Sequence, residues 1–199
     1  KRFREKRFWK TDLEESAVGK TNVALYWAEK LGCPILSTDS RQCYSELAVG
    51  SAPPSREELD RIPHYFIGDR SIQQPITAGE YEHFALATLE ELFKAYDVVV
   101  AVGGSGMYID ALLHGLDPLP SDPNVKVKLE ERAATEGLAA LKTELYHLDP
   151  EHAAKVDVRN PRRVIRALEV IEITGKKYSE QLNNTPKERP LKIVTWVLN

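Results

Sequence analysis

The 199-residue sequence predicts an α/β domain with a parallel sheet and an all-helical insertion. Two apolar runs, at 35–36 and 98–102, each end in a polar or glycine-rich turn, as buried parallel strands do. Amphipathic helical patterns alternate with these runs, and this alternation implies right-handed crossovers. After a Pro-rich turn the chain becomes helical and rich in charge. We therefore expect a core formed by 1–118 and 190–199, with the insertion at 119–189.

The first helix is predicted at 20–31, ending at Gly32, a residue type that favours the left-handed backbone at helix ends. Its apolar residues fall on one helical stripe: Val23, Ala24, Trp27, Ala28 and Leu31. The preceding residues 1–10 include six Lys or Arg and no β-branched run. We therefore predict no strand there.

Other elements have clear boundary signals. Thr77 and Glu80 form a capping-box pattern before a helix with apolar residues at helical spacing. A shorter helix is expected at 108–113. Asn160 suits an N-cap and Pro161 the first helical position, so a helix should run from there to Gly175. The apolar run 192–198 is expected to return to the sheet.

Composition favours a single-domain cytoplasmic protein. The chain has no run of eighteen apolar residues and no leader pattern, so we expect no membrane contact. Its net charge of −3 means that any nucleic-acid binding must come from local patches. Cys33 and Cys43 have no zinc-like spacing and are expected to be reduced and structural. The five histidines show no metal spacing, and we expect only a structural role for His64.

A phosphate-binding segment is indicated at 16–21, directly before the first helix. Backbone N–H groups and Lys20 there could hold a diphosphate, and the Thr21 hydroxyl could reach Mg²⁺. The pattern is incomplete because Glu14 stands where glycine is expected. An ordinary helix start is the alternative interpretation.

Two further segments follow predicted strands, where open α/β sheets bind ligands. The first is 39–44, which begins with Asp39. The second is 103–108, whose glycines would let the backbone approach a ligand closely. Taken alone, each could be an ordinary turn.

Together, these three segments resemble the tRNA dimethylallyltransferase (IPP transferase) family, with its GPTAxGKT, DSxQxY and GGTGxY motifs. The resemblance continues at 49–54 (VGSAPP), 63–67 (PHYFI) and 160–169 (NPRRVIRALE). It implies a P-loop NTPase-like parallel sheet flanked by helices. It also implies transfer of a dimethylallyl group from dimethylallyl diphosphate to N6 of the adenine 3′ of the anticodon, in tRNAs that read codons beginning with U.

The resemblance also implies roles for individual residues. Lys20 and Thr21 would neutralise the leaving diphosphate with Mg²⁺, and Asp39 would accept the adenine N6 proton. The diphosphate would lie on the loop residues Ser16, Ala17, Val18, Gly19, Lys20 and Thr21.

The implied partner is the tRNA anticodon stem-loop, bound by a monomer. Ser40, Arg41 and Gln42 would line the adenine pocket beside Asp39, and Ser105 stands where the family has a tRNA-contacting Thr. In the insertion, the implied tRNA-binding residues are Lys126, Arg162, Arg163, Val164, Ile165 and Arg166.

The sequence departs from the family pattern in two places. Glu14 and Glu15 replace Gly-Pro in the loop, and the family continues well beyond the strand expected at 192–198. We therefore expect a chain that is incomplete at both ends. Two alternatives stay open: a small-molecule kinase using ATP in the same loop, and a non-catalytic tRNA-binding remnant.

Overall fold

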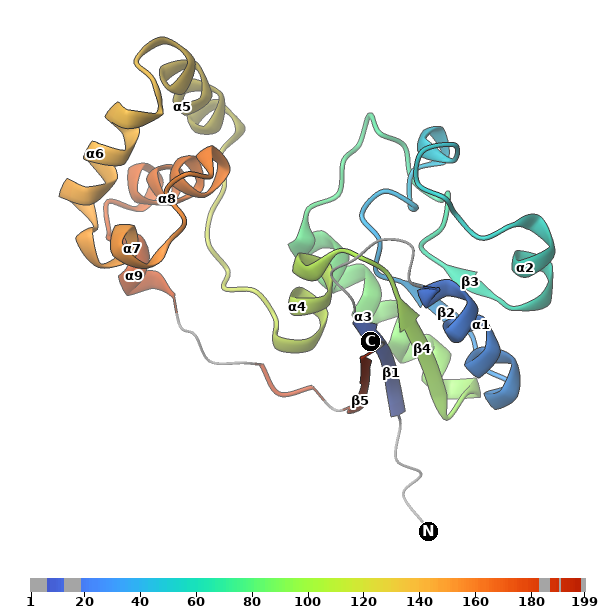
Figure 1. Cartoon of the computed structure of the whole chain (residues 1–199). Coiled ribbons are helices and arrows are strands. Elements are labelled where there is room, and N and C mark those ends of the chain that lie inside the picture. Colours follow the sequence, from blue (N-terminus) through green and yellow to red (C-terminus); the bar gives the residue numbers. More distant parts are fainter. Residues whose placement is uncertain (1–6, 13–18, 183–186, 190, 198–199) are drawn as a thin grey trace. The chain divides into compact units, whose positions relative to one another are not determined.

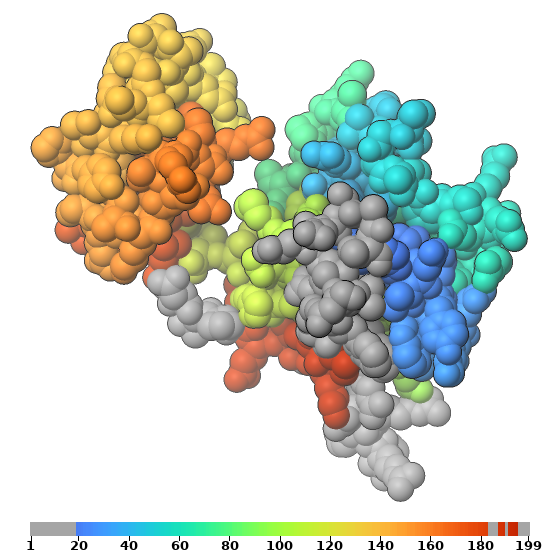
Figure 2. Space-filling view, in the orientation of Figure 1, coloured from blue at the N-terminus to red at the C-terminus, as the bar shows by residue number. Residues whose placement is uncertain are grey.

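The computed structural model of the chain describes residues 7–12, 19–182, 187–189 and 191–197. The chain divides into two compact units, one formed by 1–116 with 186–199 and the other by 117–185. We call them the α/β unit and the helical unit and describe each by itself. Figure 2 shows the helical unit, yellow to orange, as a closely packed body.

The α/β unit is built on a five-stranded parallel sheet with the order β3-β2-β4-β1-β5. The strands are β1 (Arg7–Asp12), β2 (Ile35–Ser37), β3 (His64–Tyr65), β4 (Val98–Val102) and β5 (Lys192–Val197). The strands predicted at 35–36, 98–102 and 192–198 are confirmed. The short strand β3 was not predicted.

The expectation of no strand in the opening residues was wrong. Strand β1 lies inside the sheet, where Trp9 is in register with Val100 of β4 and with Val194 of β5. Pairing on both sides satisfies the backbone N–H and C=O groups, so tertiary context outweighs the weak local signal of a charged segment. The strand required before the phosphate-binding segment is therefore present.

Helices cover both faces of this sheet (Figure 1). Side chains alternate along a strand, so Leu36 packs with α3 and α4 while its neighbour Ile35 packs with α1. The helices of the unit are α1 (Lys20–Leu31), α2 (Arg56–Arg61), α3 (Ala78–Ala95) and α4 (Gly106–His114), with a 3-10 turn at Ser45–Leu47.

The boundary signals in this unit are confirmed. Thr77 and Glu80 form a reciprocal capping box at α3, and α1 ends at Gly32 in the left-handed conformation. On α1, Ala24 and Ala28 are buried as the stripe predicted, but Leu25 is buried in place of Leu31. Cys33 and Cys43 are buried free thiols, and burial raises the pKa of each to about 11.

The helical unit packs its helices around one apolar core, which includes Leu129, Leu141, Leu145 and Leu168. The helices are α5 (Pro123–Thr135), α6 (Leu138–Leu148), α7 (Pro150–Lys155), α8 (Pro161–Thr174) and α9 (Tyr178–Gln181). Helix α8 begins after the N-cap Asn160 and ends at Gly175, as predicted. Across the described part of the chain, no helix is long and apolar enough to span a membrane.

Candidate functional site

The ends of β2 and β4 are joined by hydrogen bonds beyond the sheet. The Thr38 N–H donates to the Val102 carbonyl at 2.8 Å, and the Ser105 N–H donates to the Thr38 carbonyl at 3.1 Å. The Ser105 hydroxyl oxygen accepts from the Ser40 N–H at 2.8 Å and lies 2.9 Å from the Ser40 hydroxyl. These bonds bring two of the predicted segments, 39–44 and 103–108, together at one edge of the sheet.

Gly103 makes this close approach possible. A Cβ at this position would lie 2.3 Å from the Thr38 carbonyl carbon and 2.6 Å from the Asp39 nitrogen, which no side chain tolerates. A Cβ at Gly104 would instead lie 3.9 Å from Asp39 Oδ2 and 4.0 Å from Lys20 Nζ. A side-chain methyl at Gly104 would therefore be at van der Waals distance from both a carboxylate and an ammonium group.

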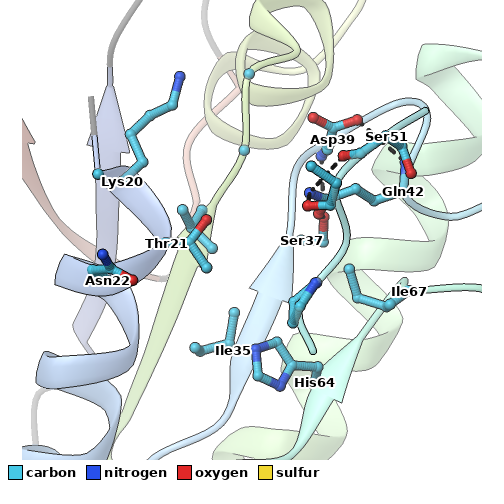
Figure 3. Close-up of a pocket in the computed structure, with 16 residues that line it drawn as sticks. Lys20, Thr21, Asn22, Ile35, Ser37, Asp39, Gln42, Ser51, His64 and Ile67 are labelled. Carbon is cyan, nitrogen blue, oxygen red and sulfur yellow. Dashed lines mark hydrogen bonds between the residues drawn. The ribbon is translucent and has the colours of Figure 1, made fainter. Parts of the chain in front are cut away.

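A cavity of about 430 Å³ opens at this edge of the sheet. Figure 3 shows Lys20 and Asp39 projecting from α1 and from the turn after β2. The cavity is lined by Gly19, Lys20, Thr21, Asn22, Ile35, Ser37, Asp39, Gln42, Ser51, Ala52, Pro54, His64, Ile67, Val102, Gly103 and Gly104. Its size suits a small organic ligand.

The start of α1 forms the cationic side of the cavity. Gly19 has φ of 79°, a left-handed conformation that turns the chain into the helix. The first N–H groups of a helix have no intrahelical partners and favour anions, so Lys20 and Thr21 lie where an anion is stabilised. The predicted loop residues Ser16, Ala17 and Val18, with Glu14 and Glu15, lie outside the described residues.

Asp39 uses its two carboxylate oxygens differently. Oδ1 accepts hydrogen bonds from the N–H groups of Arg41 at 2.8 Å and Gln42 at 3.2 Å, which fixes the turn. Oδ2 faces Gly104 and has no hydrogen bond to any described residue. One oxygen therefore holds the side chain in place and the other can accept a proton.

Gln42 supports the wall of the cavity. Its amide nitrogen donates to the carbonyls of Ser51 and Ala52, at 3.3 and 3.1 Å, and its amide oxygen accepts from the Ser37 hydroxyl at 3.3 Å. Both amide ends are therefore engaged. This connects β2 to the loop at 51–54, part of the 49–54 motif, and gives that motif a structural role.

The adjacent Arg41 differs from Gln42. Its side chain is exposed and does not line the cavity. Ser105, expected to contact tRNA, has its hydroxyl engaged by Ser40. Within the α/β unit, the structure therefore brings Lys20, Thr21, Asp39 and Gln42 together and leaves Arg41 at the surface.

In the helical unit, the predicted RNA-binding residues divide into two groups. Arg162 and Arg163 are exposed at the start of α8, and Lys126 is exposed on α5, 3.9 Å from Glu130. Val164 and Ile165 are 0% and 7% exposed. The expectation for these last two is therefore corrected: their side chains pack in the core and offer no surface to RNA.

The Arg166 side chain forms hydrogen bonds within the helical unit. Its guanidinium donates to Glu169 Oε2 at 2.7 Å and to the carbonyls of Pro120 and Leu119, at 2.9 and 3.1 Å. Burial alone would raise the pKa of Glu169, but hydrogen bonds from Ser121, Arg166 and Asp122 outweigh it and lower the pKa. Arg166 therefore compensates a buried carboxylate, and its contact with tRNA stays a prediction.

The sequence model of the IPP transferase family matches residues 42–199. Among curated relatives, the chain is similar to "tRNA dimethylallyltransferase 2" of Porphyromonas gingivalis, at 45% identity over 92% of this chain and 61% of that protein. It is similar to "tRNA dimethylallyltransferase 1" of Phocaeicola vulgatus, at 44% identity over 90% of this chain and 60% of the relative. The chain thus spans about 60% of the length of these relatives.

Solved structures of similar fold are also named as transferases of this kind. The tRNA isopentenylpyrophosphate transferase of Bacillus halodurans superposes with a TM-score of 0.54 at 31% identity, covering 87% of this chain and 57% of that one. A eukaryotic dimethylallyltransferase acting on tRNA superposes with a TM-score of 0.71 at 22% identity, over 97% of this chain and 47% of that one. The second likeness concerns the fold alone.

Proposed function

Because the chain belongs to the IPP transferase family, we propose that the full-length protein is a tRNA dimethylallyltransferase. It transfers the dimethylallyl group of dimethylallyl diphosphate to N6 of the adenine 3′ of the anticodon, in tRNAs that read codons beginning with U. The observation that carries the proposal is that Lys20 Nζ and Asp39 Oδ2 both lie near Gly104, 4.0 and 3.9 Å from the position of a Cβ there. Transfer needs a cation to stabilise the leaving diphosphate and a carboxylate to accept a proton from the nucleophile, both within one small site.

The cationic side binds the leaving group. The start of α1 and Lys20 hold the diphosphate, whose negative charge grows as the allylic C1–O bond breaks. Mg²⁺ fits this side because the Thr21 hydroxyl lines the cavity and magnesium prefers oxygen ligands. No cluster of three or more metal-ligating side chains occurs among the described residues, so the diphosphate and water would supply the other ligands. Bound there, the ion would neutralise charge on the leaving group.

Asp39 serves the nucleophile. Its Oδ2 accepts a hydrogen bond from the adenine N6 amino group and orients the nitrogen lone pair toward C1. The N6–C1 bond then forms as the C1–O bond breaks, and the N6 proton passes to Oδ2. Because Oδ1 is held by two backbone N–H groups, the carboxylate stays in place during the transfer.

We propose that the helical unit binds the anticodon stem-loop through its exposed basic residues. Arg162 and Arg163 are in adjacent positions at the start of α8, and neither side chain forms a hydrogen bond or ion pair within the described ranges. Hydrogen bonds from Arg159 lower the pKa of the nearby Asp157 carboxyl, and the charge of Arg163 adds a smaller lowering. Unpaired guanidinium groups are suited to phosphate contacts. The protein is expected to act as a cytoplasmic monomer.

The kinase alternative has less support. A phosphotransferase of this loop type favours a Mg²⁺-binding acid at the end of the strand beside the loop. Strand β4 ends instead at Val102, followed by Gly103 and Gly104. Among the described residues of the site, none specifically favours phosphoryl transfer.

The test is transfer itself. The full-length protein is incubated with Mg²⁺, unmodified tRNA and dimethylallyl diphosphate labelled in the prenyl group. γ-Labelled ATP is the control donor. We expect prenyl label in the tRNA, located at the adenine 3′ of the anticodon, and none from ATP. Label from ATP alone would identify a kinase, and binding of tRNA with no transfer from either donor would identify a binding remnant.

A further inference from the structure

One end of the cavity is formed by residues of β2 and β3 and by Ile67, which lies shortly after β3. Ile35 of β2 is in register with His64 of β3, and both line the cavity with Ile67. Figure 3 shows these three side chains together, on the side away from Lys20 and Asp39. If the diphosphate lies against α1, this end receives the hydrocarbon chain of the donor.

An unusual backbone conformation positions this end. Phe66 has φ of 67°, which a bulky residue rarely adopts. In a continued strand, His64 and Phe66 would share a face, but the turn sends Phe66 to the other face, into contact with Tyr81 and Phe84. Ile67 then returns to the cavity. The buried aromatic cluster thus fixes His64 and Ile67 on the same wall.

The hydrogen bonding of His64 determines what its ring can offer a ligand. Nδ1 lies 2.7 Å from the carbonyl oxygen of Ile62, and because a carbonyl only accepts, Nδ1 must carry the hydrogen. Burial lowers the pKa of His64, so the ring is neutral near pH 7 and Nε2 is a hydrogen-bond acceptor. Nε2 has no partner among the residues that the structure describes. Figure 3 shows one ring nitrogen turned toward Ile35 and the cavity.

From this geometry we infer that His64 is a specificity-determining residue that binds a hydroxyl group at the far end of the prenyl chain. The inference rests on the proposed function and extends its donor class to dimethylallyl diphosphates that carry a hydroxyl on a terminal methyl. The hydroxyl donates its hydrogen to Nε2, while Ile35 and Ile67 contact the hydrocarbon.

The chemistry at C1 is unchanged by the hydroxyl. The C1–O bond to diphosphate breaks, the N6–C1 bond forms, and the N6 proton passes to Asp39. The product is an adenine whose N6 carries a hydroxylated prenyl chain, formed in one step without an oxidant. A donor lacking the hydroxyl offers Nε2 no hydrogen bond of its own, so the hydroxylated donor gains one hydrogen bond in this pocket.

The test is a competition within one reaction. The full-length protein receives unmodified tRNA, Mg²⁺ and equal amounts of dimethylallyl diphosphate and 4-hydroxy-3-methylbut-2-enyl diphosphate, with the E and Z isomers in separate reactions. The ratio of the two modified adenosines is measured after digestion of the tRNA. Because the ratio is internal, it does not depend on how much of a variant is folded.

We expect the wild type to use at least one hydroxylated isomer. His64→Leu should lower the ratio of hydroxylated to dimethylallyl product by about tenfold. A tenfold change corresponds to the upper end of the net free energy of one neutral hydrogen bond. His64→Gln should retain more of the preference for the hydroxylated donor, because its amide oxygen can accept a hydrogen bond. His83→Leu is the matched control, because the ring of His83 also bonds through Nδ1 to a backbone carbonyl, that of Gly79 at 2.8 Å, but is exposed and outside the cavity.

Three results would overturn the inference. The first is an unchanged product ratio in His64→Leu, and the second is an equal change in His83→Leu. The third is a wild type that transfers dimethylallyl but neither hydroxylated chain. Each leaves the proposed function standing. A wild type that transfers no prenyl chain at all overturns the proposed function and this inference with it.

Discussion

On helix α8, arginines of one short segment have different environments. Arg166 is tied to Glu169 and to two backbone carbonyls, whereas Arg162 and Arg163 are exposed. Glu169 is 2% exposed and also accepts from Ser121 and from the Asp122 N–H. The same residue type therefore stabilises the fold at one position and is available to a partner at another.

We predict that alanine at these positions produces two separable effects. Arg162→Ala and Arg163→Ala should each reduce the slope of tRNA affinity against salt by about 0.8, because each removes one phosphate contact. Arg166→Ala should instead lower the free energy of unfolding of the helical unit by about 2 kcal/mol, since Glu169 loses its cation. Binding titrations at several salt concentrations and urea unfolding measure the two quantities. Equal salt slopes and equal stabilities in all three variants would contradict this division.

At the scale of elements, helix boundaries were predicted well because they depend on local chemistry. Thr77 with Glu80, and Asn160 with Pro161, satisfy orphan N–H groups within a few residues. Strands β1 and β3 were missed because their stability comes from partners distant in sequence, such as Val100 opposite Trp9. A strand that is short or rich in charge has little periodic signal of its own.

The same contrast holds for the site. The positions of Asp39 and Gly103 beyond strand ends, and of Lys20 at the start of a helix, were readable from motifs and topology, but the strand before Lys20 was not. The lining by His64 and Ile67 was not, because it depends on a two-residue strand and on the left-handed Phe66. Burial also separated Val164 and Ile165 from their exposed neighbours, and a motif match cannot distinguish those environments.

The turn after β4 provides a matched pair of glycine substitutions. Gly103→Ala should destabilise the protein by about 3 kcal/mol, because its Cβ would overlap backbone at Thr38 and Asp39. Gly104→Ala should leave stability within about 0.5 kcal/mol, since its nearest neighbours would be 3.9 Å away. It should still weaken donor binding, because its methyl would lie 4.0 Å from Lys20 Nζ and 3.9 Å from Asp39 Oδ2, within the site. Thermal unfolding and titration with dimethylallyl diphosphate separate the two effects, and equal stability losses would refute the assignment.

At the scale of the whole molecule, one carboxylate binds both segments of the α/β unit at which the chain leaves and re-enters it. Glu82 of α3 is 5% exposed, and its Oε2 accepts from the Leu116 N–H at 3.1 Å, where the chain leaves the unit. Its Oε1 accepts from Lys187 at 3.0 Å and Arg189 at 2.7 Å, where the chain returns. Burial alone would raise the pKa of Glu82, but these hydrogen bonds outweigh it and lower the pKa.

Glu82 should therefore make stability depend on pH. A carboxyl whose folded-state pKa lies below its unfolded value stabilises the protein above the unfolded pKa, and this contribution is lost as pH falls through the folded pKa. We predict that Glu82→Gln is less stable than wild type at pH 7 and that the difference shrinks below the ordinary glutamate pKa of 4.5. Urea unfolding from pH 7 to pH 3 checks this, with Glu90→Gln on the exposed face of α3 as control. A difference that stays constant with pH would exclude the role.

The central claim is that Asp39 is the catalytic base in a pocket that binds the donor independently of it. Asparagine can still accept the hydrogen bonds of Arg41 and Gln42, so Asp39→Asn should keep wild-type stability and donor affinity. The most direct measurement is single-turnover prenyl transfer to tRNA at saturating donor, for the full-length wild type and Asp39→Asn. We predict a rate at least about 100-fold lower in the variant. A rate within about threefold of wild type would contradict the account.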